Sequence, residues 1–186
     1  MKTEIKRQLL HGAGSLNVLG LITLGKEGMV GIILLSIVVA TILSSLRGIS
    51  KSKIWLFIEG FVISHERNDE KPLMGLLTFY TGMMLAIVLF PMKIAMLCII
   101  LLSVGDALSA LVGKMIGKHK LPINKTKSWE GSITFFLSTI SILLFAAIMP
   151  EKAIVMAVLL TMVEGLPRLD DNLTIPLAAG FMLLLF

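Results

Sequence analysis

Residues 94–112 read IAMLCIILLSVGDALSALV, an almost unbroken apolar run of the length that a helix needs to cross a bilayer. The chain of 186 residues is 56% hydrophobic and only 16% charged, whereas soluble domains are about 25% charged. Further apolar runs occur at about 9–24, 29–46, 73–91, 129–149, 153–166 and 174–186. We therefore expect residues 1–186 to form one all-α domain, a polytopic membrane helical bundle with about seven transmembrane helices. Because the last two runs are short, six spans remain an alternative.

Lys and Arg residues are concentrated in alternate connections between these runs. Residues 1–8 hold three of them, while 47–72 and 113–128 hold five each. The intervening connections hold one each. Basic residues in short loops favour the cytoplasmic side. This pattern predicts a multi-pass protein whose cytoplasmic parts are the N-terminus, 47–72, 113–128 and 167–173.

A short segment near 52–64 mixes apolar residues with charges and is too short to span, which predicts an interfacial helix. The net charge of +5 suits contact with anionic membrane lipids, and no aromatic and basic module predicts nucleic-acid binding. Cys98 is the sole cysteine, so the sequence contains no disulfide framework.

Asp106 is the most informative polar residue, because a carboxylate inside an apolar span is costly and usually functional. Small residues recur around it every four positions, a pattern that lets a backbone or a ligand approach closely; they are Gly105, Ser109, Gly113 and Gly117. The same stripe could pack between two copies, so a homo-oligomer is left open. Lysines crowd the cytoplasmic end of the stripe, namely Lys114, Lys118, Lys120, Lys125 and Lys127. This arrangement favours the hypothesis of a cleft that binds polyphosphate.

The segment Ser128–Ser132 extends the cleft to the start of the next helix. Ser128 is a suitable N-cap, and the N–H groups of a helix N-terminus suit an anion, so we include Gly131 and Ser132 with it. Glu130 is interpreted as a second carboxylate at membrane depth. Glu164 and Asp171 flank a stretch broken by Gly and Pro, and carboxylate oxygens are ligands that Mg²⁺ prefers. Asp106, Glu130, Glu164 and Asp171 are therefore our candidate metal ligands.

Near the N-terminus, Arg7 and His11 are four residues apart and share a helix face. Arg7 could bind phosphate, and His11 could hydrogen-bond it or move a proton. Taken alone, this pair fits better with an anchoring arginine and a histidine that packs between helices.

These motifs together resemble the CTP-dependent lipid-alcohol kinases: dolichol kinase, phytol kinase and the yeast-type diacylglycerol kinase, relatives of the phosphatidate cytidylyltransferases. The resemblance runs from Glu4 to Pro176. It is carried by Glu4, Arg7 and His11, by Gly105-Asp106 with Gly113 and Gly117, by Lys127-Ser128-Trp129-Glu130-Gly131-Ser132, and by Glu164 with Asp171-Asn172. Many members have Lys after the Arg, where this chain has Gln8.

The resemblance implies transfer of a phosphoryl group from CTP to a long-chain lipid alcohol, with dolichol or polyprenol favoured and Mg²⁺ as the metal. Asp106, Glu130, Glu164, Arg7 and His11 are then expected to be catalytic. Gly113, Gly117, Lys118, Lys127, Ser128, Gly131 and Ser132 are expected to bind the nucleotide. A cytidylyltransferase acting on a lipid phosphate would use the same groups, and a small membrane transporter is the alternative of another class.

Overall fold

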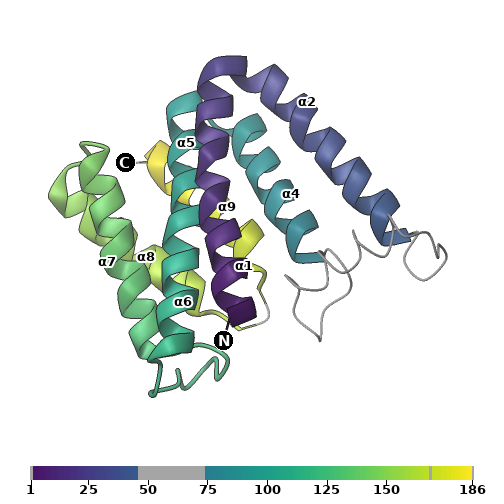
Figure 1. Cartoon of the computed structure of the whole chain (residues 1–186). Coiled ribbons are helices and arrows are strands. Elements are labelled where there is room, and N and C mark those ends of the chain that lie inside the picture. The colour runs from purple at the N-terminus through teal and green to yellow at the C-terminus, as the bar shows by residue number, and fades with distance from the viewer. Residues whose placement is uncertain (1, 46–73, 168, 186) are drawn as a thin grey trace.

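The computed structural model describes residues 2–45, 74–167 and 169–185, and its described part is helical (Figure 1). The elements are α1 (Lys2–Ala13), η1 (Gly14–Leu16), α2 (Asn17–Ser45), α4 (Met74–Leu89), α5 (Met92–Ile100), the π-helical η2 (Leu101–Asp106), α6 (Ala107–Met115), α7 (Trp129–Phe145), α8 (Pro150–Gly165) and α9 (Asp171–Leu185). The all-α prediction is confirmed, and each predicted apolar run overlaps a helix. The interfacial helix predicted near 52–64 lies outside the described residues.

Gly25 bends α2 sharply. Its φ of 70° lies in the left-handed region, which glycine adopts without the steric cost that a Cβ brings. The bend separates the predicted runs 9–24 and 29–46, and the part of α2 after it descends beside α4 (Figure 1). At this end of the molecule the ammonium of Lys26 donates to the carbonyl of Phe90, 2.5 Å away.

Two helical stretches of the described residues are long and apolar enough to cross a membrane, Ile5–Ile42 and Met92–Met115. The helices Met74–Leu89, Trp129–Phe145 and Asp171–Leu185 are apolar but shorter. Ile5–Ile42 is longer than one crossing requires, and Gly25 divides it. The number of spans remains a prediction, since these lengths alone do not establish seven.

Two apolar clusters hold the helices together. Phe90, Phe135 and Leu160 belong to one, which joins α5, η2, α7, α8 and α9. Leu21, Ile33 and further residues of α2, α4, α5 and η2 form the other. Outside these clusters, α2 exposes many large apolar side chains, and only 11% of the most apolar window in Ile5–Ile42 is buried. A lipid environment would cover such a surface.

The polar segments gather at one end of the bundle. The N-terminus and the connection between α6 and α7 lie at the same end in Figure 1. The junction of α8 and α9 joins them there, since all three line a common pocket.

Candidate active site

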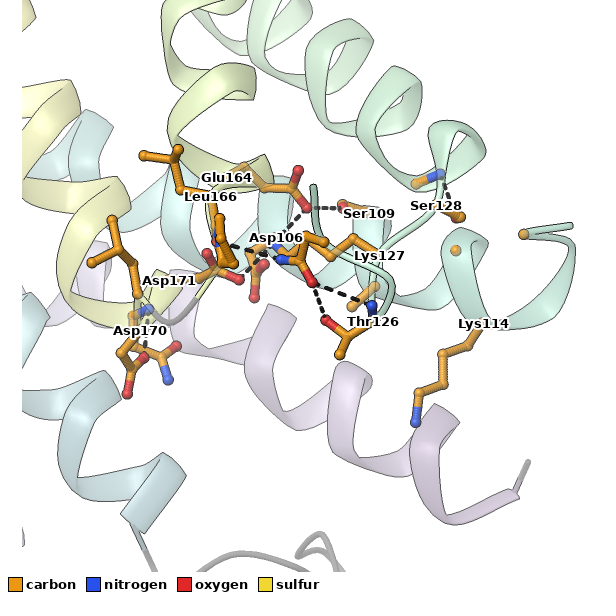
Figure 2. A pocket seen from close by; sticks show the side chains of 18 of the residues that line it. Asp106, Ser109, Lys114, Thr126, Lys127, Ser128, Glu164, Leu166, Asp170 and Asp171 are labelled. Atoms are coloured by element: carbon orange, nitrogen blue, oxygen red, sulfur yellow. Dashed lines mark hydrogen bonds and ion pairs between the residues drawn. The ribbon is translucent and has the colours of Figure 1, made fainter. Parts of the chain in front are cut away.

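The pocket at this end has a volume of about 840 Å³ (Figure 2). It brings together predicted site residues from segments far apart in the sequence: Arg7, Asp106, Gly113, Gly117, Lys127, Ser128, Gly131, Glu164 and Asp171. Their convergence supports the prediction of one polar cleft built by α1, α6, α7, α8 and α9.

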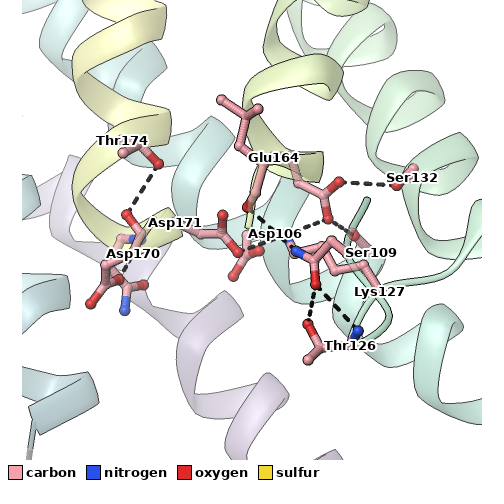
Figure 3. Close-up of polar contacts among 12 residues, drawn as sticks. Asp106, Ser109, Thr126, Lys127, Ser132, Glu164, Asp170, Asp171 and Thr174 are labelled. Carbon is pink, nitrogen blue, oxygen red and sulfur yellow. Dashed lines mark hydrogen bonds and ion pairs between the residues drawn. The ribbon is translucent and has the colours of Figure 1, made fainter. Parts of the chain in front are cut away.

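Lys127 lies at the centre of the pocket and contacts two of the predicted carboxylates. Its Nζ is 2.7 Å from Glu164 Oε1 and 2.7 Å from Asp171 Oδ2 (Figure 3). Burial alone would lower the pKa of Lys127, but the charges of Asp171 and Glu164 raise it above its ordinary value. Lys127 is therefore a charged lysine held between two acids.

Glu164 is fixed by hydroxyl groups as well as by the lysine. Ser109 donates to Oε1 at 3.1 Å, and Ser132 donates to Oε2 at 3.0 Å. Both oxygens of this buried carboxylate thus have partners, which is what a buried charge requires. Asp171 differs, because its Oδ1 is buried without a hydrogen-bond partner among the described residues.

Asp106 lies where the helix formed by α5, η2 and α6 passes from π-helical to α-helical geometry. Such π-helical turns are common at functional sites. His11 of α1 reaches across to it, with Nε2 3.3 Å from Asp106 Oδ2 and 3.2 Å from the carbonyl oxygen of Leu102. The ring of His11 packs on Phe79, with centroids 4.6 Å apart. Nothing in the sequence indicated that His11 pairs with Asp106.

The connection between α6 and α7 positions Lys127. Leu121 N–H donates to the carbonyl of Lys127, and Lys127 N–H donates to the carbonyl of Asn124. Ser128 then caps α7 as predicted, because its Oγ accepts from Gly131 N–H at 3.2 Å. Lys127 is thus held by a hydrogen-bonded turn just before the N-terminus of α7.

Glycines let α6 and α7 approach closely beside Lys127. A Cβ on Gly131 would lie 3.0 Å from the carbonyl oxygen of Ser109, and one on Gly113 would lie 3.1 Å from Ser128 Oγ. The stripe of small residues therefore packs against another helix of the same chain. The sequence had left open whether it packs within one chain or between two copies.

Glu130 and Lys118 do not join the pocket. Glu130 Oε1 accepts from His119 Nδ1 at 2.8 Å and from the backbone N–H of Lys118 at 3.1 Å. Lys118 itself is exposed. Glu130 lies off the buried face of α7, which Gly131, Ser132 and Phe135 form at helical spacing. That spacing in the sequence was a signal that could have separated Glu130 from the other acids.

Some residues that line the pocket were not predicted to bind the nucleotide. Lys114 and Lys120 line the pocket, whereas the sequence indicated only that they lie at the mouth of the cleft. Gln8 and Asn124 also line it. Asn124 donates to the carbonyl of Leu166 at 3.3 Å and so ties the α6–α7 connection to the end of α8. Nothing in the local sequence around Asn124 indicated this contact.

The donor set can be compared with what Mg²⁺ requires. In the described part of the chain, no three His, Cys, Asp or Glu side chains stand close enough to hold a metal ion by themselves. Mg²⁺ at phosphate sites is usually bound by one or two carboxylates together with substrate phosphates. Asp171, with a buried oxygen that lacks a donor, and Asp106 fit that requirement in a pocket also lined by basic residues.

Proteins of similar sequence are known among plant lipid-alcohol kinases. A probable chloroplastic phytol kinase of Zea mays is 31% identical over 135 residues, which cover 62% of this chain and 45% of that protein. A chloroplastic farnesol kinase of Arabidopsis thaliana is 36% identical over 112 residues, covering 50% of this chain and 36% of that one. An uncharacterized protein of Rickettsia prowazekii is 32% identical over 131 residues, covering 66% and 63%.

The fold and the site define a class of helical, strongly apolar proteins with a polar pocket lined by lysines and carboxylates. Within that class, the chain is related to the phytol and farnesol kinases, which confirms the resemblance to lipid-alcohol kinases. The chain spans about half the length of the plant kinases that it resembles, such as the maize protein, of which the match covers 45%. No family model matches the chain, and no solved structure matches it.

Proposed function

We propose that this protein transfers the γ-phosphoryl group of CTP to the hydroxyl of a prenyl-type lipid alcohol. The printed names of the relatives, phytol kinase and farnesol kinase, favour an isoprenoid acceptor. CTP as the donor comes from the family resemblance. Dolichol or polyprenol, the acceptor that the sequence analysis favoured, has the same chemistry with a longer tail.

One observation carries the proposal: Asp106, Glu164 and Asp171 share a pocket with Arg7 and Lys127. Phosphoryl transfer needs little covalent help from a protein, since its catalysis rests on positioning and on neutralising charge. A pocket that presents both cations and carboxylates at the end of an apolar bundle provides these two functions.

The proposal gives each group one role. Asp106 would accept the proton of the acceptor hydroxyl, whose oxygen would attack the γ-phosphorus while CDP leaves. Arg7, Lys114 and Lys120 line the pocket and are the cations proposed for the phosphates, whereas Lys118 does not line it. Mg²⁺, when bound at Asp171 or Asp106, would neutralise charge on the transferred group.

The lipid would reach this site from the bilayer. Met74, Leu166 and Leu169 give the pocket an apolar side, and each is exposed by 40% or more. Leu166 lies beside Glu164 and Asp171 in Figure 2, away from Lys114. An alcohol whose tail stays in lipid could therefore present its hydroxyl near Asp106, with the nucleotide approaching from the lysine side.

The test uses purified protein in mixed micelles with Mg²⁺ and CTP labelled either at the γ- or at the α-phosphate. Farnesol, phytol, geranylgeraniol, polyprenol, diacylglycerol and phosphatidate are offered separately. We expect label from the γ-position alone to enter a prenyl alcohol. Label from the α-position in a lipid phosphate would instead establish a cytidylyltransferase. Absence of label from either position, with ATP also inactive, would contradict the kinase proposal and return the transporter alternative.

A further inference from the structure

The ion pairs of Lys127 occupy positions that the proposed reaction needs for a metal. Glu164 and Asp171 were predicted as metal ligands, yet each directs one oxygen at the same ammonium, 2.7 Å away. Lys127 was predicted to bind phosphate. In the structure its ammonium pairs with carboxylates instead, and Figure 3 shows it between them.

The two carboxylates are not equivalent. Glu164 also accepts hydrogen bonds from Ser109 and Ser132, neither of which involves the lysine. Asp171 has a buried Oδ1 without a donor, and its Oδ2 is held by Lys127. If the lysine withdraws, Glu164 therefore stays satisfied, whereas Asp171 presents two free oxygens to whatever replaces it. A divalent cation satisfies such oxygens better than a second hydrogen-bond donor does.

We infer that Lys127 is an internal counter-ion that holds the cation position at Asp171 until a divalent metal arrives with the nucleotide. Lys127 then moves from the carboxylates to a phosphate of that nucleotide. This inference rests on the proposed function for its nucleotide step. It makes Lys127 a positioning residue that exchanges partners, and it makes Asp171 a carboxylate released for metal binding.

The position of Lys127 suits an exchange over a short distance. The residue precedes α7 in a turn, and its ammonium is carried on four flexible carbons. At the start of α7 the N–H groups of Trp129 and Gly131 already donate, to the carbonyl of His119 and to Ser128 Oγ, so the phosphate partner of Lys127 is expected in the pocket and not on these groups. Ser128 and Gly131 line the pocket beside Lys127, so a phosphate bound there would lie within reach of the same side chain and the backbone would not need to move.

Binding of Mn²⁺ in place of Mg²⁺, followed by electron paramagnetic resonance in micelles without nucleotide or lipid, tests the inference. Lys127→Met removes the charge but keeps the length of the side chain. We expect this variant to bind Mn²⁺ at least about tenfold more tightly than the wild type, because the competing cation is gone. Lys125→Met, an exposed lysine of the same turn, is the matched control and should leave the affinity unchanged. An unchanged or weaker affinity in folded Lys127→Met would overturn the inference.

A second measurement uses the wild type, so that it does not depend on the folding of a variant. Crystals grown with Mn²⁺ and a non-hydrolysable CTP analogue should show anomalous scattering beside Asp171, with Lys127 turned to a phosphate. A bound metal and nucleotide with both ion pairs of Lys127 intact would overturn the inference. Neither measurement requires turnover, so failure of the kinase proposal would be recognised separately by the labelled-CTP assay.

Discussion

His11 and Asp106 are joined across 95 positions of the chain, with Nε2 of the histidine 3.3 Å from Oδ2 of the aspartate. The same nitrogen lies 3.2 Å from the carbonyl oxygen of Leu102. A carbonyl oxygen can only accept a hydrogen bond, so Nε2 carries a proton and donates it. His11 therefore positions the Asp106 carboxylate from α1.

Replacing His11 tests this positioning role. We expect His11→Ala to lower kcat on the order of 10²-fold with little change in the KM for CTP, because a carboxylate that is misplaced by a small distance loses its alignment. His11→Gln should recover part of the rate, since an amide N–H can still donate. Steady-state kinetics on both variants checks the prediction. Equal losses in the two variants would indicate that His11 matters for something other than the hydrogen bond that it donates.

Gly117 tests the close approach of α6 and the turn before α7. A Cβ there would run into the carbonyl of Gly113 and the side chain of Ser128. We expect Gly117→Ala to lower the free energy of unfolding by about 1–3 kcal/mol, as forced overpacking does. Gly31→Ala is the control, because open space surrounds Gly31 in α2 and alanine favours a helix. Thermal unfolding in detergent compares them, and a Gly117→Ala protein as stable as the wild type would refute the packing.

Much of the fold could be predicted from the sequence, and so could many of the residues that the structure brings into one pocket. Apolar runs predicted the helices, because burial in lipid or protein requires continuous apolar surface, and the cost of Asp106 in such a run made it a candidate site residue. Glu130 shows the limit of this reasoning. A charge near the start of a helix does not indicate which way its side chain points. The side chain of Glu130 points to His119, because α7 buries its opposite face.

The partner of Lys127 could not be read from the sequence either. Lys127 is 37 positions from Glu164 and 44 from Asp171, and charge alone does not distinguish a phosphate partner from a carboxylate partner. Asn124 and His11 illustrate the same limit, since their contacts depend on how helices meet in space. Residue types thus indicated the chemistry of the site, while the pairing of its residues required the tertiary structure.

Lys120 tests which cations receive the nucleotide. It lines the pocket, whereas Lys93 is exposed at the start of α5 and is not among the pocket residues. We expect Lys120→Met to raise the KM for CTP about tenfold with a smaller effect on kcat, because a charge-assisted contact to phosphate is lost. Lys93→Met should be neutral. The difference between the two variants should shrink at high salt, where exposed charges are screened. An unchanged KM in Lys120→Met would place the phosphates elsewhere.

The predicted orientation can be checked by labelling single cysteines. Cys98 is buried, so it gives little background. Lys125→Cys in the turn before α7 should react with a membrane-impermeant maleimide only after spheroplasts are permeabilised, because the lysine-rich connection is predicted to be cytoplasmic. Lys93→Cys, at the start of α5 and so at the other end of the helix formed by α5, η2 and α6, should react in intact spheroplasts. The reverse pattern would invert the orientation, and labelling of both in intact cells would contradict a bilayer between them.

The measurement that tests the central claim most directly is transfer of γ-labelled phosphate from CTP to farnesol or phytol by the wild type and by Asp106→Asn. The substitution keeps the shape of the side chain and removes its charge and its ability to accept a proton. We predict transfer by the wild type and a loss of at least about 10²-fold in Asp106→Asn, at an unchanged thermal unfolding midpoint. Glu151→Gln, an exposed acid at the start of α8, should retain full activity. Wild-type turnover in folded Asp106→Asn would contradict the account.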